Sequence, residues 1–486
     1  MNGSIPSQLF GLSNLKSLNL CSNRFQGPLP NGRWNMTSLE FLDVSQNSLN
    51  SHIPYSVYHC TNLKFLDMHS NKFQGIISKS ISNLTSLSYL DISYNMFTGE
   101  IPKEIGKLKK LTGIHFSQNM FYGHLPESIG FLSSLKELGF LNNMLEGIVT
   151  ESHFVNLTKL KFLVAYGNRL TLNVSPNWIP PFQLDELELT GWNLGPGFPA
   201  CLQSQNHISL LAIPNAQIED EIPTWFWNFS SSLETIDVSH NQLRGDVRNT
   251  LFRLPKDNAQ LRVYLGSNQF SGPLPRLPVN MVELDLSNNF FSRDVSSFLC
   301  HAQNVSYELQ ILLLGGNELS GEIPDCWMHW PNLEVINVKE NQLIGSMPNS
   351  TRLLNMLRSL DAHKNMFSGD FPPSLQKCTI LLKLDLSENV FTGKIPTWLG
   401  TSLSYLAILR LRSNHFFGEL PPNICHLSFL HLLDLADNNF FGGIPMCFRN
   451  LSSMINNIDY NENEKMPSSI VFEIYHESAL VTTKGQ

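Results

Sequence analysis

The sequence predicts an α/β solenoid, a stack of about 18 coils of about 24 residues, with a concave parallel β-sheet and a convex side of irregular and 3-10 segments. Three observations predict it. One leucine motif recurs along nearly the whole chain, an asparagine occupies one fixed position of that motif, and glycine and proline follow the asparagine at fixed distances. One coil cannot bury its own leucines, so neighbouring coils must supply the core.

The motif predicts the path of each coil. It reads L-x-x-L-x-L-x-x-N-x-[LF]-x-G-x-[IL]-P, as in LLKLDLSENVFTGKIP at residues 381–396. The alternation in L-x-L predicts a short strand whose leucines point inward and whose other residues face solvent. The later glycine gives the backbone freedom to turn, and the proline bars a regular helix.

The asparagine position predicts a hydrogen-bonded ladder. A buried amide at the end of the strand has donors and an acceptor for backbone groups of its own coil and the neighbouring coil. Only Trp192 and Ala216 replace Asn in the eighteen repeats. The predicted ladder comprises Asn23, Asn47, Asn71, Asn95, Asn119, Asn143, Asn241, Asn317, Asn341, Asn365, Asn389, Asn414 and Asn438, and the repeat position is also Asn at Asn168, Asn268 and Asn289.

The repeat also predicts the domain boundaries. We expect a solenoid over residues 1–445, with irregular repeats near 169–216 and 246–310, and a non-repeat tail over 446–486. The chain begins inside a repeat, shows no terminal cap or signal peptide, and has no apolar run long enough to span a bilayer. These features predict a fragment or truncated gene model, cut at both ends.

Composition and local motifs argue against several function classes. A net charge of −8 with a pI near 6.0 offers no basic face for nucleic acid. The glycine-rich segment Gly195–Ala200 occupies the G-x-[IL]-P slot of its repeat, and Cys326–His329 lacks a second metal-ligand pair. No nucleophile-elbow or kinase motif is present. We therefore expect no catalytic residue, no cofactor and no metal site.

Four of the eight cysteines share two offsets from the repeat asparagine. Cys300 and Cys425 lie eleven residues after it, whereas Cys326 and Cys447 lie nine after it in the following coil. Stacking brings such positions to disulfide distance. We expect Cys300–Cys326 and Cys425–Cys447 bridges, the alternative being four reduced, buried thiols.

Asn-x-Ser/Thr triplets point to an extracellular location. There are nine of them, and Asn35, Asn83, Asn228 and Asn450 all lie twelve residues after the repeat position, on the expected convex side. Glycans there would leave the concave sheet open. The predicted glycosylation sites are Asn35, Asn83, Asn156, Asn228, Asn304 and Asn450.

The concave sheet is the predicted binding surface, because aromatic and arginine residues are common anchors of protein interfaces. An acidic stripe also runs along it, four residues before the asparagine, from Asp43 to Asp434. The alternative is that all of these are ordinary solvated strand residues. The candidate ligand-binding residues are Tyr94, His115, Tyr166, Tyr264, His363, Arg412 and His415.

The segment LRLRSNHFF places two arginines side by side on this surface. Register puts Arg410 between Asp385 and Asp434, which predicts a lateral charge ladder. Arg412 lies between Ser387 and Ala436 on the adjacent strands, so we expect it to be the freer of the two and the better candidate for a ligand contact.

The repeat resembles the plant-specific leucine-rich repeat, whose diagnostic part is the G-x-I-P ending. Segments 178–205, 222–228 and 320–338 resemble plant receptor-like proteins, most of all the group of tomato xylanase receptors and apple scab-resistance proteins. The tail SALVTTKGQ is similar to the island segment of that group, which is implicated in ligand or co-receptor contact. The resemblance implies a right-handed superhelix.

The resemblance further implies a function. The full protein would be a receptor on the extracellular side of the plant plasma membrane, without a kinase domain, that binds a protein or peptide ligand and signals in defence or development through co-receptor or adaptor kinases. Two alternatives remain: a secreted inhibitor of a microbial cell-wall-degrading enzyme, similar to the polygalacturonase-inhibiting proteins, and an inert gene fragment.

Overall fold

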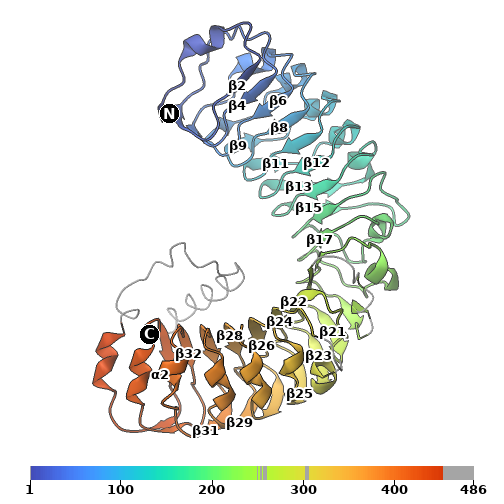
Figure 1. Ribbon diagram of the computed structural model, residues 1–486. Coiled ribbons are helices and arrows are strands. Elements are labelled where there is room, and N and C mark those ends of the chain that lie inside the picture. Colours follow the sequence, from blue (N-terminus) through green and yellow to red (C-terminus); the bar gives the residue numbers. More distant parts are fainter. Residues whose placement is uncertain (1, 249, 252–253, 255–259, 301–305, 452–486) are drawn as a thin grey trace. The chain divides into compact units, whose positions relative to one another are not determined.

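The computed structural model describes residues 2–248, 250, 251, 254, 260–300 and 306–451, and it consists of two compact units, Met1–Arg244 and Gly245–Gln486. In each unit, successive coils stack so that each contributes one strand to a parallel sheet, here called the main sheet (Figure 1). The predicted solenoid is confirmed, and the main-sheet strands number 18 over the described residues.

The main sheet of the first unit pairs strands in chain order. Each strand is three residues long, and every pairing is parallel. The strands are β2 (Ser17–Asn19), β4 (Phe41–Asp43), β6 (Phe65–Asp67), β8 (Tyr89–Asp91), β10 (Gly113–His115), β12 (Glu137–Gly139), β14 (Phe162–Val164), β16 (Glu186–Glu188), β17 (Leu210–Ala212) and β18 (Thr235–Asp237).

The main sheet of the second unit follows the same rule. Its pairings are also parallel, with one register shift at Leu261/Arg262. The strands are β20 (Leu261–Tyr264), β22 (Met281–Asp285), β24 (Ile311–Leu313), β26 (Val335–Asn337), β28 (Ser359–Asp361), β30 (Lys383–Asp385), β32 (Ile408–Arg410) and β34 (Leu432–Asp434).

A second set of short parallel strands, together called the second sheet below, follows the asparagine in many coils. The sequence pattern did not predict it. In the first unit it comprises β1 (Asn2–Gly3), β3 (Arg24–Gly27), β5 (Ser48–Leu49), β7 (Gln74–Gly75), β9 (Met96–Gly99), β11 (Met120–Gly123), β13 (Met144–Val149) and β15 (Arg169–Leu172). β19 (Arg244–Asp246) lies at the unit boundary, and the second unit has β21 (Gln269–Gly272), β23 (Phe290–Asp294), β25 (Glu318–Glu322), β27 (Gln342–Gly345), β29 (Met366–Asp370), β31 (Val390–Thr392), β33 (Phe417–Gly418) and β35 (Asn439–Phe440).

Short helices return each coil to the next strand, and most are of the 3-10 type that was expected for the convex side. Most are 3-10 helices whose N-cap is the motif proline, for example Pro102 before η4 (Lys103–Lys107). The others in the first unit are η1 (Ser7–Gly11), η2 (Tyr55–His59), η3 (Lys79–Asn83), η5 (Glu127–Phe131), η6 (Glu151–Phe154), η7 (Ala200–Ser204) and η8 (Thr224–Asn228). The second unit has α1 (Ser296–Leu299), η10 (Trp327–His329), η11 (Asn349–Leu353), η12 (Pro373–Lys377), α2 (Leu399–Ser402), η13 (Pro422–His426) and η14 (Met446–Asn450).

The asparagine ladder forms as predicted. Asn119 Nδ2 lies 3.0 Å from the Ile92 carbonyl of the preceding coil and 3.1 Å from the Phe116 carbonyl of its own. Its Oδ1 accepts the Phe97 N–H at 3.0 Å. The same pattern recurs at Asn47 and Asn389. One side chain thus satisfies donors and acceptors of two coils, which would otherwise be buried without partners.

The two departures from asparagine keep part of this bonding. Trp192 Nε1 donates to the Ala165 carbonyl at 3.0 Å, so the indole replaces the cross-coil amide donor. Ala216 has no polar side chain, but its N–H donates to Asn241 Oδ1 of the next coil at 2.9 Å. The main sheet therefore continues through β16 and β17, although no second-sheet strand lies between them.

The core between the two sheets is apolar and regular. The residues at the inward strand positions, such as Leu66 and Ile114, are fully buried. Phenylalanines two residues after the asparagine stack coil on coil, with ring centroids 6.2 Å apart for Phe73–Phe97 and 6.3 Å for Phe97–Phe121. Burial of such rings is the main favourable term that holds successive coils together.

Both predicted disulfides are present. The Cα atoms lie 5.5 Å apart in Cys300–Cys326 and 5.9 Å apart in Cys425–Cys447, and each bridge joins adjacent coils. The remaining cysteines, among the described residues, are free: Cys21, Cys60, Cys201 and Cys378. Burial raises the pKa of the Cys60 and Cys201 thiols to about 11, as expected of packing residues rather than nucleophiles.

The predicted tail lies largely outside the described residues. Of residues 446–486, only 446–451 are described, and they form η14 and the buried Leu451. None of the helices in the described part of the chain has the length and apolar run needed to cross a membrane.

Candidate functional site

The solvent-facing side of the main sheet, called the concave face below, carries the acidic row seen in the sequence. In all eight of its aspartates, Oδ1 accepts the N–H of the residue two positions later, at 2.8 to 3.3 Å. Where that residue is serine, its hydroxyl also donates in several coils, as Ser93 does to Asp91 at 2.6 Å. Each aspartate therefore closes the turn after its own strand, so the row has a structural role.

An aromatic stack covers the first part of the concave face. The Phe41 and Phe65 rings lie 4.4 Å apart, and the Phe65 and Tyr89 rings 4.7 Å apart, both nearly parallel. The stack ends at Gly113, where an added Cβ would lie 2.9 Å from the Tyr89 ring. Tyr89 therefore leans across the glycine toward His115, with ring centroids 5.4 Å apart.

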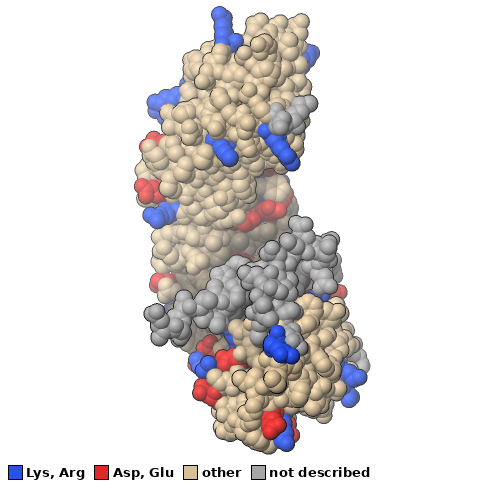
Figure 2. Space-filling view, turned by 90° about the vertical axis from the view of Figure 1, so that its left-hand side faces the viewer, with Lys and Arg blue, Asp and Glu red and all other residues tan. Residues whose placement is uncertain are grey.

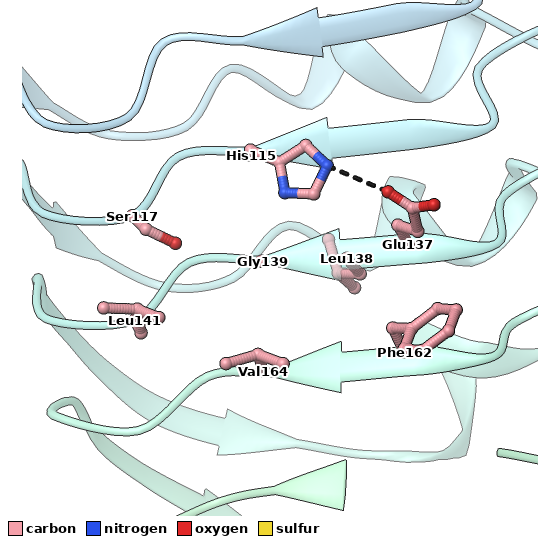
Figure 3. Close-up of a pocket in the computed structure, with 8 residues that line it drawn as sticks. All are labelled: His115, Ser117, Glu137, Leu138, Gly139, Leu141, Phe162 and Val164. Carbon is pink, nitrogen blue, oxygen red and sulfur yellow. Dashed lines mark hydrogen bonds and ion pairs between the residues drawn. The ribbon is translucent and has the colours of Figure 1, made fainter. Parts of the chain in front are cut away.

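Beyond this stack the face is hollowed. The hollow has a volume of about 360 Å³ and is lined by residues of β10, β12, β14 and the turns after β10 and β12: His115, Ser117, Glu137, Leu138, Gly139, Leu141, Phe162 and Val164. Figure 3 shows His115 and Glu137 pointing toward each other on one side of it, with Phe162 and Val164 on the other. Gly139 lies between them without a side chain, which explains the hollow.

Charged groups border the hollow on both sides. His115 Nε2 lies 3.2 Å from Glu137 Oε2. On the far side, strand register puts Glu186 beside Phe162 and Glu188 beside Val164. Burial, together with the nearby Glu186 carboxylate, raises the pKa of Glu188. Figure 2 shows a small patch of acidic side chains on the shaded surface above the grey residues, while Lys and Arg side chains lie both at the edges and on the front of this view.

The concave face of the second unit carries a dense ion-pair network instead. Lys383 Nζ and Asp361 Oδ2 lie 3.0 Å apart, and both side chains are 2% exposed. Burial opposes ionisation of Asp361, but the His363 hydrogen bond and the Lys383 charge outweigh it, so the Asp361 pKa is lowered. Asp385 has a raised pKa because of burial and the nearby Asp361 charge. This network is internally satisfied.

The structure corrects the reading of the arginine pair. Arg410 NH1 lies 3.4 Å from Asp385 Oδ2 and its register partner on β34 is Asp434, as predicted. Arg412, expected to be the freer residue, lies 2.8 Å from Asp434 and 3.3 Å from Asp437. Its long side chain reaches diagonally to these two carboxylates, which do not lie directly opposite Arg412 on the adjacent strand. It remains the more exposed, at 46% against 19%.

The other candidate residues divide between the units. His115 lines the hollow, and Tyr166 follows β14, which contributes two lining residues. Tyr94 precedes its ladder asparagine in a left-handed conformation, with φ of 52°, and is exposed. These three belong to the first unit and the rest to the second.

In the second unit, hydrogen bonds engage three of the four remaining candidates, one of which is Arg412, described above. The Tyr264 hydroxyl donates to Glu283, and His363 Nδ1 lies 2.8 Å from Asp361 Oδ1. His415 follows Asn414, after β32 has ended, and so does not belong to the outward row of the main sheet as expected. The predicted residues therefore do not form one cluster.

Two Asp–His–Asp groups bring metal-ligand atoms within 4.8 Å of one another. One is Asp361, His363 and Asp385, where Lys383 already supplies a positive charge. The other is Asp67, His69 and Asp91, where His69 Nδ1 lies 2.8 Å from Asp67 Oδ1. Hydrogen bonding explains both arrangements, and the absence of a metal site stays a prediction.

Sequence reasoning missed most of the hollow. Glu137, Gly139, Phe162, Glu186 and Glu188 were not among the candidates. Aligning the outward strand positions coil by coil would have shown glycine on two adjacent strands, Gly113 opposite Glu137 and Gly139 opposite His115. The missed signal was a lack of side chains rather than a conspicuous residue.

Comparisons with known proteins agree with this architecture. A family model described as a leucine-rich repeat region matches residues 4–256, and single leucine-rich repeats match residues 308–330, 356–378, 381–402, 405–427 and 429–451. The last match extends to the end of the described residues, where η14 completes its coil.

Curated relatives are plant receptor-like proteins. Receptor-like protein EIX2 of Solanum lycopersicum is 40% identical over 189 residues, which is 39% of this chain and 18% of that protein. Receptor-like protein EIX1 of the same species is 42% identical over 134 residues, 27% of this chain and 13% of that protein. The matched region is thus less than a fifth of each relative.

Solved structures of plant receptor kinases share the fold. The leucine-rich repeat ectodomain of the Arabidopsis receptor kinase HAESA, in complex with an N-terminally extended IDA peptide hormone ligand, has a TM-score of 0.71 and 27% identity, covering 93% of this chain and 79% of that one. HAESA in complex with IDA and the co-receptor SERK1 gives a TM-score of 0.69 and 29% identity, covering 93% and 75%.

Proposed function

Since the chain belongs to the leucine-rich repeat proteins, we propose that it is a ligand-binding ectodomain region of a plant cell-surface receptor-like protein without a kinase domain. The protein acts on the extracellular side of the plasma membrane, in defence or developmental signalling. Its ligand is a protein or peptide, and co-receptor or adaptor kinases carry the signal onward. The similar HAESA ectodomain binds a peptide hormone and the co-receptor SERK1.

One observation carries the proposal: in each unit the concave face is a continuous row of parallel strands, and in the first unit outward residues such as Tyr89, Glu137 and Glu188 are partly exposed. Such a surface offers many side chains to an extended ligand at a rigid spacing of about 4.8 Å per strand. The described glycosylation candidates Asn35, Asn83, Asn156 and Asn228 are exposed outside the main-sheet strands. Glycans on them would leave the concave face accessible.

The test blocks the concave face with an added glycan. The substitutions F162N/V164T create an Asn-x-Thr triplet on β14, and Y122N/H124T create one on β11 of the second sheet as a matched control. Each variant and the unaltered chain is secreted from plant cells, immobilised, and exposed to apoplastic fluid and to culture filtrate of a plant-associated fungus. Mass spectrometry identifies the retained proteins and peptides.

We expect the unaltered chain and Y122N/H124T to retain the same species and F162N/V164T to lose them. Retention that survives the β14 glycan but not the β11 glycan would contradict a concave-face ligand site. Retention of a fungal cell-wall-degrading enzyme together with inhibition of its activity would replace the receptor proposal with the inhibitor alternative.

A further inference from the structure

The hollow in the first unit combines an apolar wall with a missing side chain. Gly139 occupies an outward position of β12, and its register neighbours on the adjacent strands are His115 and Val164. Leu141, Phe162 and Val164 line the space next to Gly139. An apolar side chain of a ligand that entered here would replace water against this wall, which is favourable in proportion to the area buried.

The carboxylates beside the hollow lack the partners that similar carboxylates have elsewhere. In the second unit, outward acidic residues on adjacent strands pair with basic ones, as in Glu283 with Arg262 at 3.2 Å and Asp361 with Lys383 at 3.0 Å. Among the described residues of the first unit, neither Glu186 nor Glu188 has a basic partner.

Strand register explains why these glutamates are unpaired. Glu186 lies between Phe162 and Leu210, and Glu188 lies between Val164 and Ala212, so both flanking strands offer only apolar side chains. The nearest lysine at the start of β14, Lys161, lies 3.0 Å from Asp185 instead. Two half-buried carboxylates in an apolar row carry a desolvation cost that a cation from outside would offset.

From this geometry we propose that the hollow takes an apolar side chain of an extended, cationic peptide segment, and that a neighbouring Lys or Arg of the same segment pairs with Glu186 and Glu188. The inference rests on the proposed function and names the ligand class of its concave site. Parallel strands are spaced about 4.8 Å apart and an extended chain advances about 3.3 Å per residue. The basic residue therefore lies roughly two or three positions from the apolar one.

The charged groups at the rim of the hollow favour a cationic ligand. Asp91 lies beside His115 in register, and Glu137 lies within 3.2 Å of the same histidine. Acidic groups thus stand on both sides of an apolar floor, and an anionic ligand would be repelled from either side. Electrostatic complementarity of this kind selects partners and orients them.

The experiment uses a displayed library of short random peptides, selected on the secreted full chain at moderate ionic strength. We expect enrichment of segments in which Leu, Met, Phe or Tyr precedes or follows Lys or Arg at the spacing above. The Kd of one enriched peptide is then measured for the unaltered chain, for E186Q/E188Q and for G139V, in which a valine fills the hollow. An added Cβ on Gly139 would approach only movable side chains closely, His115 Nδ1 at 3.2 Å and Ser117 Oγ at 3.5 Å.

Both variants should bind the peptide at least about tenfold more weakly. Replacing the peptide's apolar residue by Ala should weaken binding to the unaltered chain but not to G139V. E127Q/E146Q makes the same change in net charge away from the main sheet, since Glu127 lies on η5 and Glu146 on β13, and should leave the Kd unchanged.

Selection of acidic or uncharged peptides, or a Kd that both variants leave unchanged, would overturn this inference. Either result would leave the proposed function standing, provided that the β14 glycan still abolishes ligand retention. If the library yields no binder and the β14 glycan also has no effect on retention, both proposals fail together.

Discussion

Single side chains decide whether neighbouring coils fit together, and the ladder asparagine is the clearest case. Asn119 is 9% exposed and connects backbone groups of two coils through Nδ2 and Oδ1. No apolar residue of similar size has donors and an acceptor. The residue type was therefore predictable from chemistry alone.

The first prediction concerns this residue. Asn119→Ala should lower the free energy of unfolding by roughly 1–3 kcal/mol, because the Phe97 N–H and the Ile92 carbonyl lose their partner. Urea unfolding followed by circular dichroism measures the change. Asn355→Ala, at an exposed position outside the ladder, is the control and should shift the midpoint little. Equal shifts in both variants would refute the ladder's contribution.

The buried ion pair in the second unit gives a second prediction at this scale. Lys383→Met should destabilise the protein by about 3–5 kcal/mol at neutral pH, because it leaves the buried Asp361 carboxylate without its cation. The double variant K383M/D361N should recover much of this loss. Urea midpoints of the three proteins measure it.

The pH dependence of this effect has a defined sign. The folded-state pKa of Asp361 is lowered, so its stabilising contribution is present above the ordinary carboxyl pKa of about 4 and is lost as the pH falls through the lower folded-state value. The difference between the unaltered chain and K383M should therefore shrink from pH 7 toward pH 3. A difference that grows on acidification would contradict the assignment.

At the scale of elements, each coil is a strand, a turn and a short helix that only its neighbours stabilise. The disulfides reinforce this at two places: one joins Cys300, directly after α1, to Cys326, directly before η10, and the other joins η13 to η14. The positions of the disulfides were predictable from two repeated offsets from the repeat asparagine. In stacked coils, residues at the same offset from this asparagine lie at the same place on each coil.

The third prediction tests these bridges. C300S/C326S should lose about 3 kcal/mol of stability, chiefly because the unfolded chain regains the freedom of a closed loop with a sequence separation of 26 residues. Urea unfolding with and without reductant measures it, and peptide mapping without reduction identifies the bridges. Cys21→Ser removes a free thiol and should change stability little. A variant that combines C300S/C326S with C425S/C447S should not lose stability when reductant is added. If it does, the cysteines pair differently.

At the scale of the whole molecule, the candidate glycosylation sites and the candidate ligand surface lie on different parts of the coils. The described glycosylation candidates lie away from the main sheet, and the unpaired carboxylates and the hollow lie on it. A regular repeat produces this separation automatically, since each coil presents the same positions to the same side. A ligand surface and a glycan surface can then coexist on one scaffold.

The fourth prediction concerns the glycans. In a plant secretory system, Asn83 at the end of η3 should carry a glycan, and Asn83→Gln should lower the mass by one glycan without changing ligand retention. Thr85→Ala, which removes the acceptor motif but keeps Asn83, should give the same mass loss. Mass spectrometry before and after deglycosylation measures both. An unaltered mass in either variant would show that the site is unused.

The sequence by itself determined the repeat, the main sheet, the ladder and both disulfides, because each depends on residue type and spacing along the chain. Only the tertiary structure decided the second sheet, the diagonal contacts of Arg412 and the hollow beside Gly139. The reason is physical. A side chain's reach across strands, and the space left where side chains are missing, depend on which residues of other coils lie beside it, and spacing within one coil does not contain that information.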